Sequence, residues 1–396
     1  MRRLHFLAIA GGAVLSACGG PIDPLTPPLV MSAAVRAPTI TMTDVGTFGG
    51  GACRRPSSQF VDVNDRGLAV GWSDSVCYFG RGMMWDGSTM TSLGTFVPVA
   101  VNNHDQLAGN QFMPAPIGTN RAFIWESGAL TDLGTLGGPR SDAVALNDRG
   151  QVVGSSTTAS GETHAFFWEN GVMTDLGTLG GSSSQAVAIN DHGQVVGNGA
   201  TATGANHAFL WQDGVMTDLG TLGGSFSIVT ALNDRGQVVG GSATATGVGH
   251  AFLWQDGVMA DLGTLGRSSF AHAVNNHGQV AGVNVLEGAE GSHAFLWEDG
   301  VMTDLGAWLP RGDIVERVRI TDRGEVVGAM KTGGLFPGGT LFLWQEGTTT
   351  PLPSEAPGSV TALNKHGEFV GWVGGEFVRT ARLWTIAPNA QVAAGP

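Results

Sequence analysis

Four short runs of β-forming residues, separated by turn signals, recur along most of this chain. The first run is rich in alanine and valine and ends in asparagine, as at residues 143–147. The second is Gln-Val-Val-Gly at 151–154, the third is His-Ala-Phe-Leu-Trp at 207–211, and the fourth is Val-Met-Thr-Asp-Leu-Gly at 215–220. Short runs of β-branched and aromatic residues bounded by Gly, Asn, Asp and Ser are typical of strands. The pattern predicts four strands in each period.

The segments between the runs predict how these strands are connected. In Asn147-Asp148-Arg149-Gly150 the Asn and Asp side chains can bond the backbone two residues on, and the glycine can take a positive φ, which favours a four-residue hairpin turn. Asn170-Gly171 and its Asp-Gly equivalents join the third and fourth runs, and such pairs are the strongest signal for a two-residue type I′ turn. Each period is therefore predicted to form a four-stranded antiparallel meander.

The tryptophan that ends the third run gives the length of the period. It recurs at Trp85, Trp125, Trp168, Trp211, Trp254, Trp297, Trp344 and Trp384, with spacings of 40, 43, 43, 43, 43, 47 and 40 residues. The turn after the first run occurs equally often, at Asn64, Asn103, Asn147, Asn190, Asn233, Asn276, Asp322 and Asn364. A fixed period of this length indicates a solenoid, a propeller or an array.

The two ends of the repeat region distinguish a ring from an open stack. The first recognisable run, residues 43–50, is a fourth strand without a first three, and the last, residues 381–385, is a third strand without a fourth. A closed ring would pair these ends and remove the exposed edge strands. We predict an all-β fold over residues 39–386, an eight-bladed β-propeller of four-stranded antiparallel blades in which the N-terminal strand completes the last blade. The alanine-rich run would be innermost and Thr-Asp-Leu-Gly outermost, a tail would follow at 387–396, and seven blades remain the alternative.

Composition supports a packed β protein and argues against one class of partner. Glycine contributes 63 residues, but 42% of the chain is hydrophobic and it contains 11 tryptophans, which is too apolar for a disordered chain. The formal net charge of −13 argues against nucleic acid as a ligand, since nucleic acids are bound by clustered Lys and Arg. We expect a monomer.

The amino terminus is predicted to carry a targeting signal rather than part of the fold. Met1-Arg2-Arg3 precedes an apolar run from Leu4 to Leu15, which predicts a signal peptide over residues 1–17. Leu15-Ser16-Ala17-Cys18 resembles the lipobox of bacterial lipoproteins, and this resemblance implies that Cys18 is lipidated and anchors the protein to a membrane. A plain secretory signal is the alternative. Gly19 follows the cysteine, which in similar lipoproteins permits sorting to the outer membrane.

Residues 18–38 are rich in proline and predict an extended tether between the lipid and the folded body. We therefore expect the protein in the cell envelope, lipid-anchored at the outer membrane or cell surface.

The repeated Leu-Asn-Asp-x-Gly-Gln-Val-Val-Gly, His-Ala-Phe-Leu-Trp and Met-Thr-Asp-Leu-Gly-Thr-Leu-Gly-Gly are similar to the HAF-repeat family of bacterial proteins. The similarity is close over residues 131–304 and loose in the flanking periods, where the histidine is replaced. The resemblance implies an extracellular location, and it implies no catalytic residue.

Residues that recur in every period are expected to stabilise the fold. Four histidines, at His164, His207, His250 and His293, are spaced 43 residues apart, and we expect each to bond an Asp or Thr of its own period rather than to share a metal ion. The Asn-Asp turns offer too few oxygens for calcium, which takes six to eight. The sequence therefore predicts neither a metal site nor a cofactor.

Residues that break the repeat are the candidates for a binding site. If Cys18 is lipidated, Cys53 and Cys77 are the two remaining cysteines of the sequence. Two thiols in an oxidising compartment predict a disulfide. Aromatic residues and arginines, which are common in binding hot spots, concentrate near the two ends of the repeat. The candidate patch consists of Arg54, Arg55, Trp72, Tyr78, Trp308, Arg311, Arg317, Arg319 and Trp372. Ordinary divergence beside the ring closure is the alternative explanation.

These features favour a non-enzymatic binding or scaffold propeller whose protein or glycan ligand is unknown. The alternative is an envelope hydrolase or lyase that acts on glycans at the mouth of the channel, for which Glu316, Arg317 and His366 are the residues to test. A third hypothesis is a purely structural surface-layer element.

Overall fold

The structure is a computed structural model, and it describes residues 40–48, 57–74, 80–113, 118–289, 291–306, 314–331, 340–353, 356–374 and 378–386. The chain divides into two compact units, residues 1–36 and residues 37–396. All of the described residues belong to the second unit, and the description below concerns this unit alone. Within the described ranges, no helix is long and apolar enough to cross a membrane.

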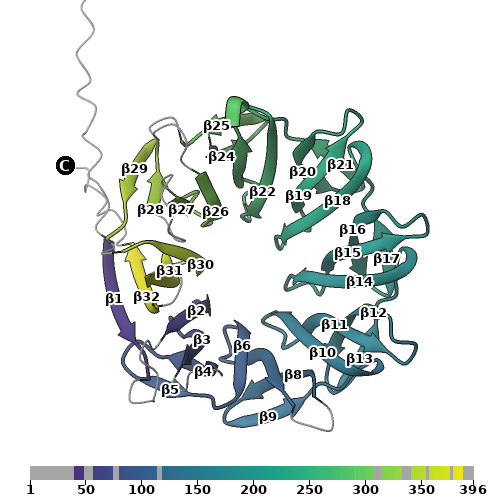
Figure 1. The fold of residues 1–396 in the computed structure, drawn as a ribbon, viewed down its shortest axis with the longest axis vertical. Helices are drawn as coiled ribbons and strands as arrows, with labels where there is room; N and C mark the ends of the chain where they lie inside the picture. Colours follow the sequence, from purple (N-terminus) through teal and green to yellow (C-terminus); the bar gives the residue numbers. More distant parts are fainter. Residues whose placement is uncertain are drawn as a thin grey trace, which may run out of the picture. The chain divides into compact units, whose positions relative to one another are not determined.

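The second unit is a ring of antiparallel meanders around a central channel, and the strands of each meander follow one another from the channel to the rim (Figure 1). The innermost strands are β2 (Ser58–Val63), β6 (Phe96–Val101), β10 (Gly137–Leu146), β14 (Gly180–Ile189), β18 (Gly223–Leu232), β22 (Ser268–Val274), β26 (Ile314–Ile320) and β30 (Gly358–Leu363). The second strands are β3 (Ala69–Asp74), β7 (Leu107–Phe112), β11 (Val152–Thr158), β15 (Val195–Thr201), β19 (Val238–Thr244), β23 (Val280–Val285), β27 (Val326–Lys331) and β31 (Glu368–Gly374).

The outer half of each meander consists of a long third strand and a short strand at the rim. The third strands are β4 (Gly80–Trp85), β8 (Asn120–Glu126), β12 (Thr163–Glu169), β16 (Asn206–Gln212), β20 (Gly249–Gln255), β24 (Ser292–Glu298), β28 (Thr340–Gln345) and β32 (Arg379–Ile386). The outermost strands are β5 (Met90–Ser92), β9 (Ala129–Asp132), β13 (Val172–Asp175), β17 (Val215–Asp218), β21 (Val258–Asp261), β25 (Val301–Asp304), β29 (Thr348–Pro351) and β1 (Ile40–Gly46). One 3₁₀ turn, Glu287–Ala289, precedes β24. The predicted order, with the alanine-rich run inside and Thr-Asp-Leu-Gly outside, is confirmed.

Hydrogen bonding divides these strands into four sheets of four strands and two sheets of eight. Each eight-stranded sheet consists of two meanders joined by a single parallel residue pair, Thr163 with Ser183 in one and Ser292 with Ile314 in the other. The unit is thus all-β and propeller-like, and its building block is the predicted four-stranded meander.

The closing strand β1 pairs antiparallel with β32, so the last sheet has the order β1-β32-β31-β30. Its register runs from Ile40 opposite Ile386 to Asp44 opposite Arg382. The start of the folded chain therefore supplies the strand that its end lacks, as predicted from the sequence.

The turns have the chemistry that the sequence indicates. Asn170 has a φ of 51° and is followed by Gly171 at 85°, the two positive values that a type I′ turn requires. The innermost strands also carry a β-bulge, visible in β10 as a register shift between Ala143 and Ala145. The bulge inserts one residue, Val144, without a partner on β11 and so bends the strand where the meanders converge.

The hydrophobic core lies between neighbouring meanders rather than within one sheet. One cluster joins Val153 of β11 and Ala165 of β12 to Ala186, Val195 and Phe209 of the next meander. Phe209 is fully buried over Gly197, where an added Cβ would lie 2.2 Å from the carbonyl oxygen of Gln185 and 2.5 Å from the Phe209 ring. The glycine that ends each Gln-Val-Val-Gly run is therefore required by this close approach.

A repeated serine links each of several meanders to the next. The Ala165 amide donates to Ser184 Oγ at 2.8 Å, and Ser184 Oγ donates to the carbonyl of Gly177, so β14 is tied to both β12 and its rim loop. The same arrangement occurs at the ring closure, where Ser58 Oγ accepts from the Ala381 amide and donates to the carbonyl of Gly46. The first and last meanders thus meet through the same contacts as interior neighbours.

Candidate functional site in the central channel

The turns between the first and second strands surround one end of the channel, and their asparagines form a ladder around it. In the most regular meanders Asn147 Nδ2 donates to the carbonyl of Asn190 at 2.9 Å, and Asn190 Nδ2 donates to the carbonyl of Asn233 at 3.0 Å. Equivalent bonds of 2.7–3.0 Å join Asn64 to Asn102, Asn102 to Asn147, Asn233 to Asn275, Asn275 to Thr321, and Asn364 to Asn64. These buried amides have a structural role, because each satisfies a carbonyl of the next meander.

The ladder is interrupted at one position in the described chain. Thr321 replaces the asparagine of the β26–β27 turn, and its shorter side chain bonds Glu325 Oε2 at 3.1 Å instead of reaching Asn364. Glu325, which is 2% exposed, is in turn held by Arg323 at 2.9 Å. The β26 and β30 meanders are therefore not joined by the asparagine side-chain-to-carbonyl hydrogen bond that joins the other neighbouring meanders.

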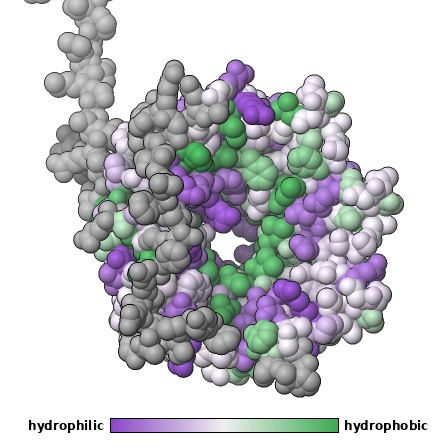
Figure 2. Space-filling view, viewed as in Figure 1, coloured by the Kyte–Doolittle hydropathy of each residue, from purple (hydrophilic) through white to green (hydrophobic). Residues whose placement is uncertain are grey.

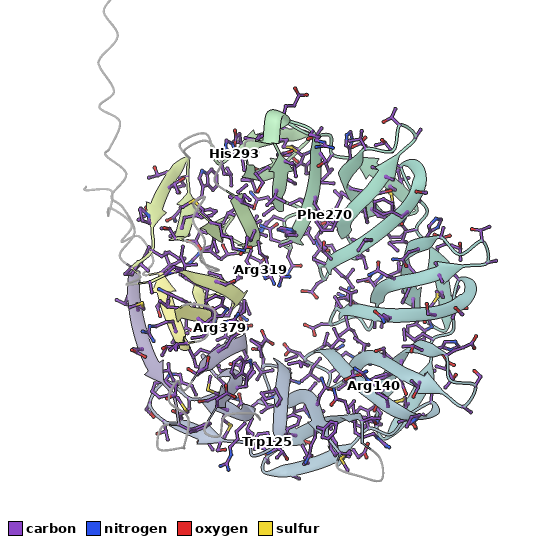
Figure 3. The ribbon with its side chains drawn as sticks, viewed as in Figure 1. Trp125, Arg140, Phe270, His293, Arg319 and Arg379 are labelled. Carbon is purple, nitrogen blue, oxygen red and sulfur yellow. The ribbon has the colours of Figure 1, made fainter. Side chains whose placement is uncertain are left out.

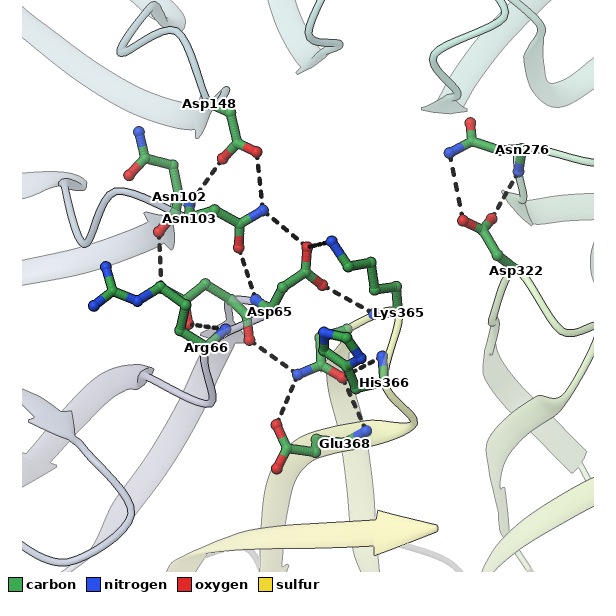
Figure 4. A network of polar contacts seen from close by, with 12 residues as sticks. Asp65, Arg66, Asn102, Asn103, Asp148, Asn276, Asp322, Lys365, His366 and Glu368 are labelled. Carbon is green, nitrogen blue, oxygen red and sulfur yellow. Dashed lines mark hydrogen bonds and ion pairs between the residues drawn. The ribbon is translucent and has the colours of Figure 1, made fainter. Parts of the chain in front are cut away.

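The residue after each asparagine points into the channel and forms a second ring, part of which is shown in Figure 4. The ring consists of Asp65, Asn103, Asp148, Asp191, Asp234, Asn276, Asp322 and Lys365. Most members donate their backbone amide to the side chain of the next, as Asp65 does to Asn103 Oδ1 at 2.8 Å. The ring borders a cavity of about 340 Å³ and contains five carboxylates, two amides and one ammonium group.

Amide groups donate hydrogen bonds to some carboxylates of this ring, and one ammonium group neutralises part of its charge. Asn103 Nδ2 bridges Asp65 and Asp148 at 2.8 and 2.9 Å. Lys365 Nζ lies 2.9 Å from Asp65 Oδ2. Burial would raise the pKa of Asp65, but the hydrogen bonds from Lys365 and Asn103 outweigh burial and lower this pKa. At Asp191 burial and the neighbouring carboxylates of Asp148 and Asp234 raise the pKa, despite the hydrogen bond from the Asp148 amide. This mouth of the channel is therefore negative.

A second cavity, of about 520 Å³, lies along β14, β18, β22 and β26 and carries different side chains. Leu232 lines both cavities, so the second one adjoins the first. Its wall includes Phe270, His272, Arg317 and Arg319. Figure 2 shows that the channel is open and bordered by both hydrophobic and hydrophilic residues, and Figure 3 places Arg319 at its edge.

Arg319 and Asp62 replace the small residue that the repeat places at one position of the innermost strand. Pairing with the second strand aligns Asp62 of β2 and Arg319 of β26 with Ala145 of β10. Arg319 Nε donates to the carbonyl of Thr361 at 3.2 Å, so the guanidinium reaches across to the next meander. Two charged side chains therefore flank the β30 meander where the repeat has alanine.

The electrostatics of these two groups are coupled. Burial and repulsion from Arg317 lower the pKa of Arg319 to about 10, and the attraction of Asp62 acts in the opposite direction. Burial raises the pKa of Asp62 to about 6, even though its carboxylate accepts hydrogen bonds from the amides of Val101 and Val63 and is attracted by Arg319. Arg319 is thus charged at neutral pH in a partly desolvated position.

Arg317 and His272 complete the polar part of the second cavity. Arg317 is exposed, and within the described residues no carboxylate lies within ion-pair distance of Arg317 or Arg319. His272 Nδ1 accepts from the Val318 amide at 3.4 Å, which places the proton of a neutral imidazole on Nε2. Burial and the two arginines lower the pKa of His272 to about 4, so the ring is neutral at pH 7. Glu316 pairs with Lys331 and does not neutralise the arginines.

The recurring histidines lie outside the channel and have the predicted structural role. Nδ1 of His164, His207, His250 and His293 lies 2.8–3.0 Å from a carboxylate oxygen of Asp175, Asp218, Asp261 and Asp304. Arginine replaces histidine in the pairs Arg121–Asp132 and Arg382–Asp44. The described residues contain no group of three or more His, Cys, Asp or Glu that could hold a metal ion.

The described members of the predicted patch lie in two places. Arg317 and Arg319 share the second cavity. Trp372 is only 7% exposed, and the Arg379 guanidinium covers its ring at 4.3 Å and donates to Gln59, so this tryptophan belongs to the contact between the last and first meanders. Trp72 lies on β3, next to Gln59 of β2.

Of the residues considered for catalysis, Glu316 and Arg317 meet in the second cavity, while His366 lies in the β30–β31 turn outside it. Cys18, Cys53, Arg54, Arg55, Cys77, Tyr78, Trp308 and Arg311 lie outside the described residues, and the predicted lipidation and disulfide stay predictions.

The sequence did not single out His272 and Lys365, which line the two cavities, or Asp62, which attracts Arg319. A position-by-position alignment of the repeats could have found them. Asp62 stands where the repeat has alanine, His272 where it has valine or threonine, and Lys365 where it has Asp or Asn.

Comparison with known proteins supports the fold and nothing finer. No protein-family model and no curated protein matches the sequence. A structure from a study of two prolyl endopeptidases is 12% identical, with a TM-score of 0.50 over 81% of this chain and 52% of that chain. The β-propeller domain of the Trilobed protease from Pyrococcus furiosus is 10% identical, with a TM-score of 0.49 over 76% of this chain and 96% of that chain. TolB from Acinetobacter baumannii is 11% identical, with a TM-score of 0.35 over 62% and 61%.

This chain spans about half the length of the prolyl endopeptidase. At this identity the match shows a β-propeller fold and carries no information on activity.

Proposed function

We propose that this protein is a non-enzymatic binding propeller of the bacterial cell envelope that holds its ligand in the central channel. The observation that supports this most is the second cavity, where Arg317, Arg319 and His272 converge, and where the repeat has mainly alanine at the position of Arg319 and valine or threonine at that of His272. Ligand sites in proteins are typically concave, largely apolar and furnished with a few convergent polar groups. The cavity has this composition.

The rest of the repeat supports the same proposal by contrast. The His-Asp pairs, the Asn ladder and the Ser links recur from meander to meander and are satisfied by internal hydrogen bonds. A group that is repeated and satisfied serves the fold, whereas a ligand site needs one asymmetric set of residues. The arginines of β26 are such a set, because they occur in one meander only.

A glycan array probed with the purified full-length protein tests the proposal. We expect wild-type protein to bind a defined subset of glycans, Arg317→Gln to lose that binding, and Arg149→Gln to retain it. Arg149 is a matched control because it is an exposed arginine outside the second cavity.

Recovery of the bound glycan distinguishes the alternatives. A shortened or unsaturated product would contradict the non-enzymatic assignment and favour the hydrolase or lyase. If no glycan binds, the surface-layer element becomes the better hypothesis for the absence of a glycan ligand. If Arg317→Gln and wild type bind alike, the second cavity is not the glycan site.

The proposal includes three finer points. Each four-stranded meander is one blade, which makes an eight-bladed propeller; the chain is a HAF-repeat protein; and Cys18 is lipidated and anchors it. The recurrence of one turn, one tryptophan and one innermost strand per meander supports the blade count. Labelling cells with radioactive palmitate tests the anchor, since Cys18→Ser should lose both the label and the membrane association. Label retained by that variant would contradict it.

A further inference from the structure

The second cavity combines two unneutralised guanidinium groups with an apolar wall. Elsewhere among the described residues, Lys365 of the first cavity pairs with Asp65 and Arg121 of the rim pairs with Asp132. Arg317 and Arg319 have none within 4.0 Å, and they are close enough for Arg317 to lower the pKa of Arg319. Two like charges are thus held together in a chain whose net charge is −13.

The backbone explains why the two arginines share one side of the cavity. In β26 the register shift lies between Val315 and Arg317, so Glu316 is the unpaired residue, whereas in the regular strand β10 the shift lies between Ala143 and Ala145. Arg317 and Arg319 then pair with Ala329 and Val327 and are two residues apart on an unbulged strand, which places them on the same face. The displaced bulge creates this arrangement.

Neutral donor and apolar groups surround these charges. His272 is neutral, with its proton on Nε2, because Nδ1 accepts from the Val318 amide. The Phe270 ring lies edge-on to His272, with 5.7 Å between the ring centroids, and packs over Gly241, where an added Cβ would lie 2.3 Å from the ring. Val187 of β14 also lines the cavity. The wall therefore offers two cations, one neutral donor and apolar surface, and its one carboxylate, Glu316, pairs with Lys331.

We propose that this cavity binds a small organic dianion, whose carboxylate or phosphate oxygens contact Arg317 and Arg319 and whose carbon skeleton packs against Phe270 and Val187. A guanidinium matches the planar oxygens of a carboxylate or phosphate with paired hydrogen bonds, and such charge-assisted bonds are stronger in a partly desolvated site. His272 Nε2 donates a further bond to the anion. This inference rests on the proposed binding function and gives the ligand its chemical class.

Isothermal titration of purified full-length protein tests the inference, with succinate, inorganic phosphate and uncharged succinamide as probes. We expect saturable binding of succinate, of phosphate or of both, with no binding of succinamide. The affinity should fall as salt is raised, because ion pairing is screened. Binding of succinate alone would identify a carboxylate ligand, and binding of phosphate alone would identify a phosphate-bearing one.

Variants assign the binding to the cavity. We expect Arg317→Gln to weaken binding at least tenfold, Arg317→Lys to weaken it less, and Arg149→Gln to leave it unchanged. The Arg317 side chain is exposed and makes no hydrogen bond or ion pair within the described chain, so its replacement should not impair folding, which circular dichroism would check. Absence of anion binding, equal binding of succinamide, or equal affinity in Arg317→Gln would overturn the inference. A neutral glycan that is bound by wild type and lost in Arg317→Gln would overturn the dianion and leave the binding function intact.

Discussion

Replacing Asn233 by alanine tests whether the amide ladder holds neighbouring meanders together. Asn233 is 5% exposed and makes four hydrogen bonds of 2.7–3.0 Å. Its Nδ2 donates to the Asn275 carbonyl and to Gln237 Oε1, and its Oδ1 accepts from the amides of Arg235 and Gln237. With a net contribution of about 1 kcal/mol for each hydrogen bond, Asn233→Ala should lower the free energy of unfolding by about 4 kcal/mol.

Equilibrium unfolding in urea, followed by both tryptophan fluorescence and circular dichroism, measures this change, and coincident transitions would justify a two-state treatment. Asn206→Ala is the matched control. Asn206 is exposed on β16, and surface substitutions of this kind usually change stability by less than about 0.5 kcal/mol. If Asn233→Ala and Asn206→Ala have the same unfolding midpoint, the ladder does not stabilise the ring and our reasoning is refuted.

Three further predictions concern the ring closure and the channel. Trp384 is fully buried against Phe369, so Trp384→Ala should lower the urea-unfolding free energy by about 3–5 kcal/mol; a loss below 1 kcal/mol would contradict its role in closure. Asp44→Ala should cost no more than about 1 kcal/mol in the same assay, because the Asp44 side chain is 58% exposed, although that of Arg382 is only 13% exposed; a larger loss would show that the ion pair, rather than strand pairing, holds the closing strand.

The third prediction concerns pH. The pKa of His272 falls from 6.5 to about 4 on folding, so its contribution to stability is present above pH 6.5 and is lost as the pH falls toward 4. Wild type should lose about 3 kcal/mol of unfolding free energy as the pH falls from 6.5 to 4, and His272→Val should not show this loss. The stability difference between wild type and variant, measured at pH 7, 5.5 and 4, checks this, and a constant difference would contradict it.

The fold could be predicted because its determinants are local and repeated. Asn170-Gly171 sets a hairpin by its own dihedral preferences, and the spacing of Trp168, Trp211 and Trp254 sets the period. Ring closure followed from the incomplete runs at residues 43–50 and 381–385, which β1 and β32 confirm.

The second cavity could not be predicted because it depends on a register that the sequence does not state. The stretch that leads from β26 into the turn, Val318-Arg319-Ile320-Thr321, is one residue shorter than the equivalent stretch of the β10 meander, Ala143-Val144-Ala145-Leu146-Asn147. The bulge of β26 therefore lies earlier in the strand, at Glu316. Only this displacement brings Arg317 and Arg319 to one face. The predicted patch combined both arginines with Trp372. The sequence alone does not say that the arginines face the channel while Trp372 packs between meanders.

The pairing of Ile40 with Ile386 has a consequence for the connectivity of the chain. The two ends of the propeller lie on adjacent antiparallel strands, directly opposite one another. In the regular meanders the pair equivalent to Thr385 with Thr41 is Glu169 with Val172, which is joined by Asn170-Gly171 alone, so Ile386 and Ile40 stand at the positions of the two turn residues. An Asn-Gly dipeptide in place of Ile386 and Ile40, joining Thr385 directly to Thr41, would therefore reproduce an ordinary rim hairpin. The protein could then be circularly permuted, with new termini at any of the other rim turns and the same ring retained.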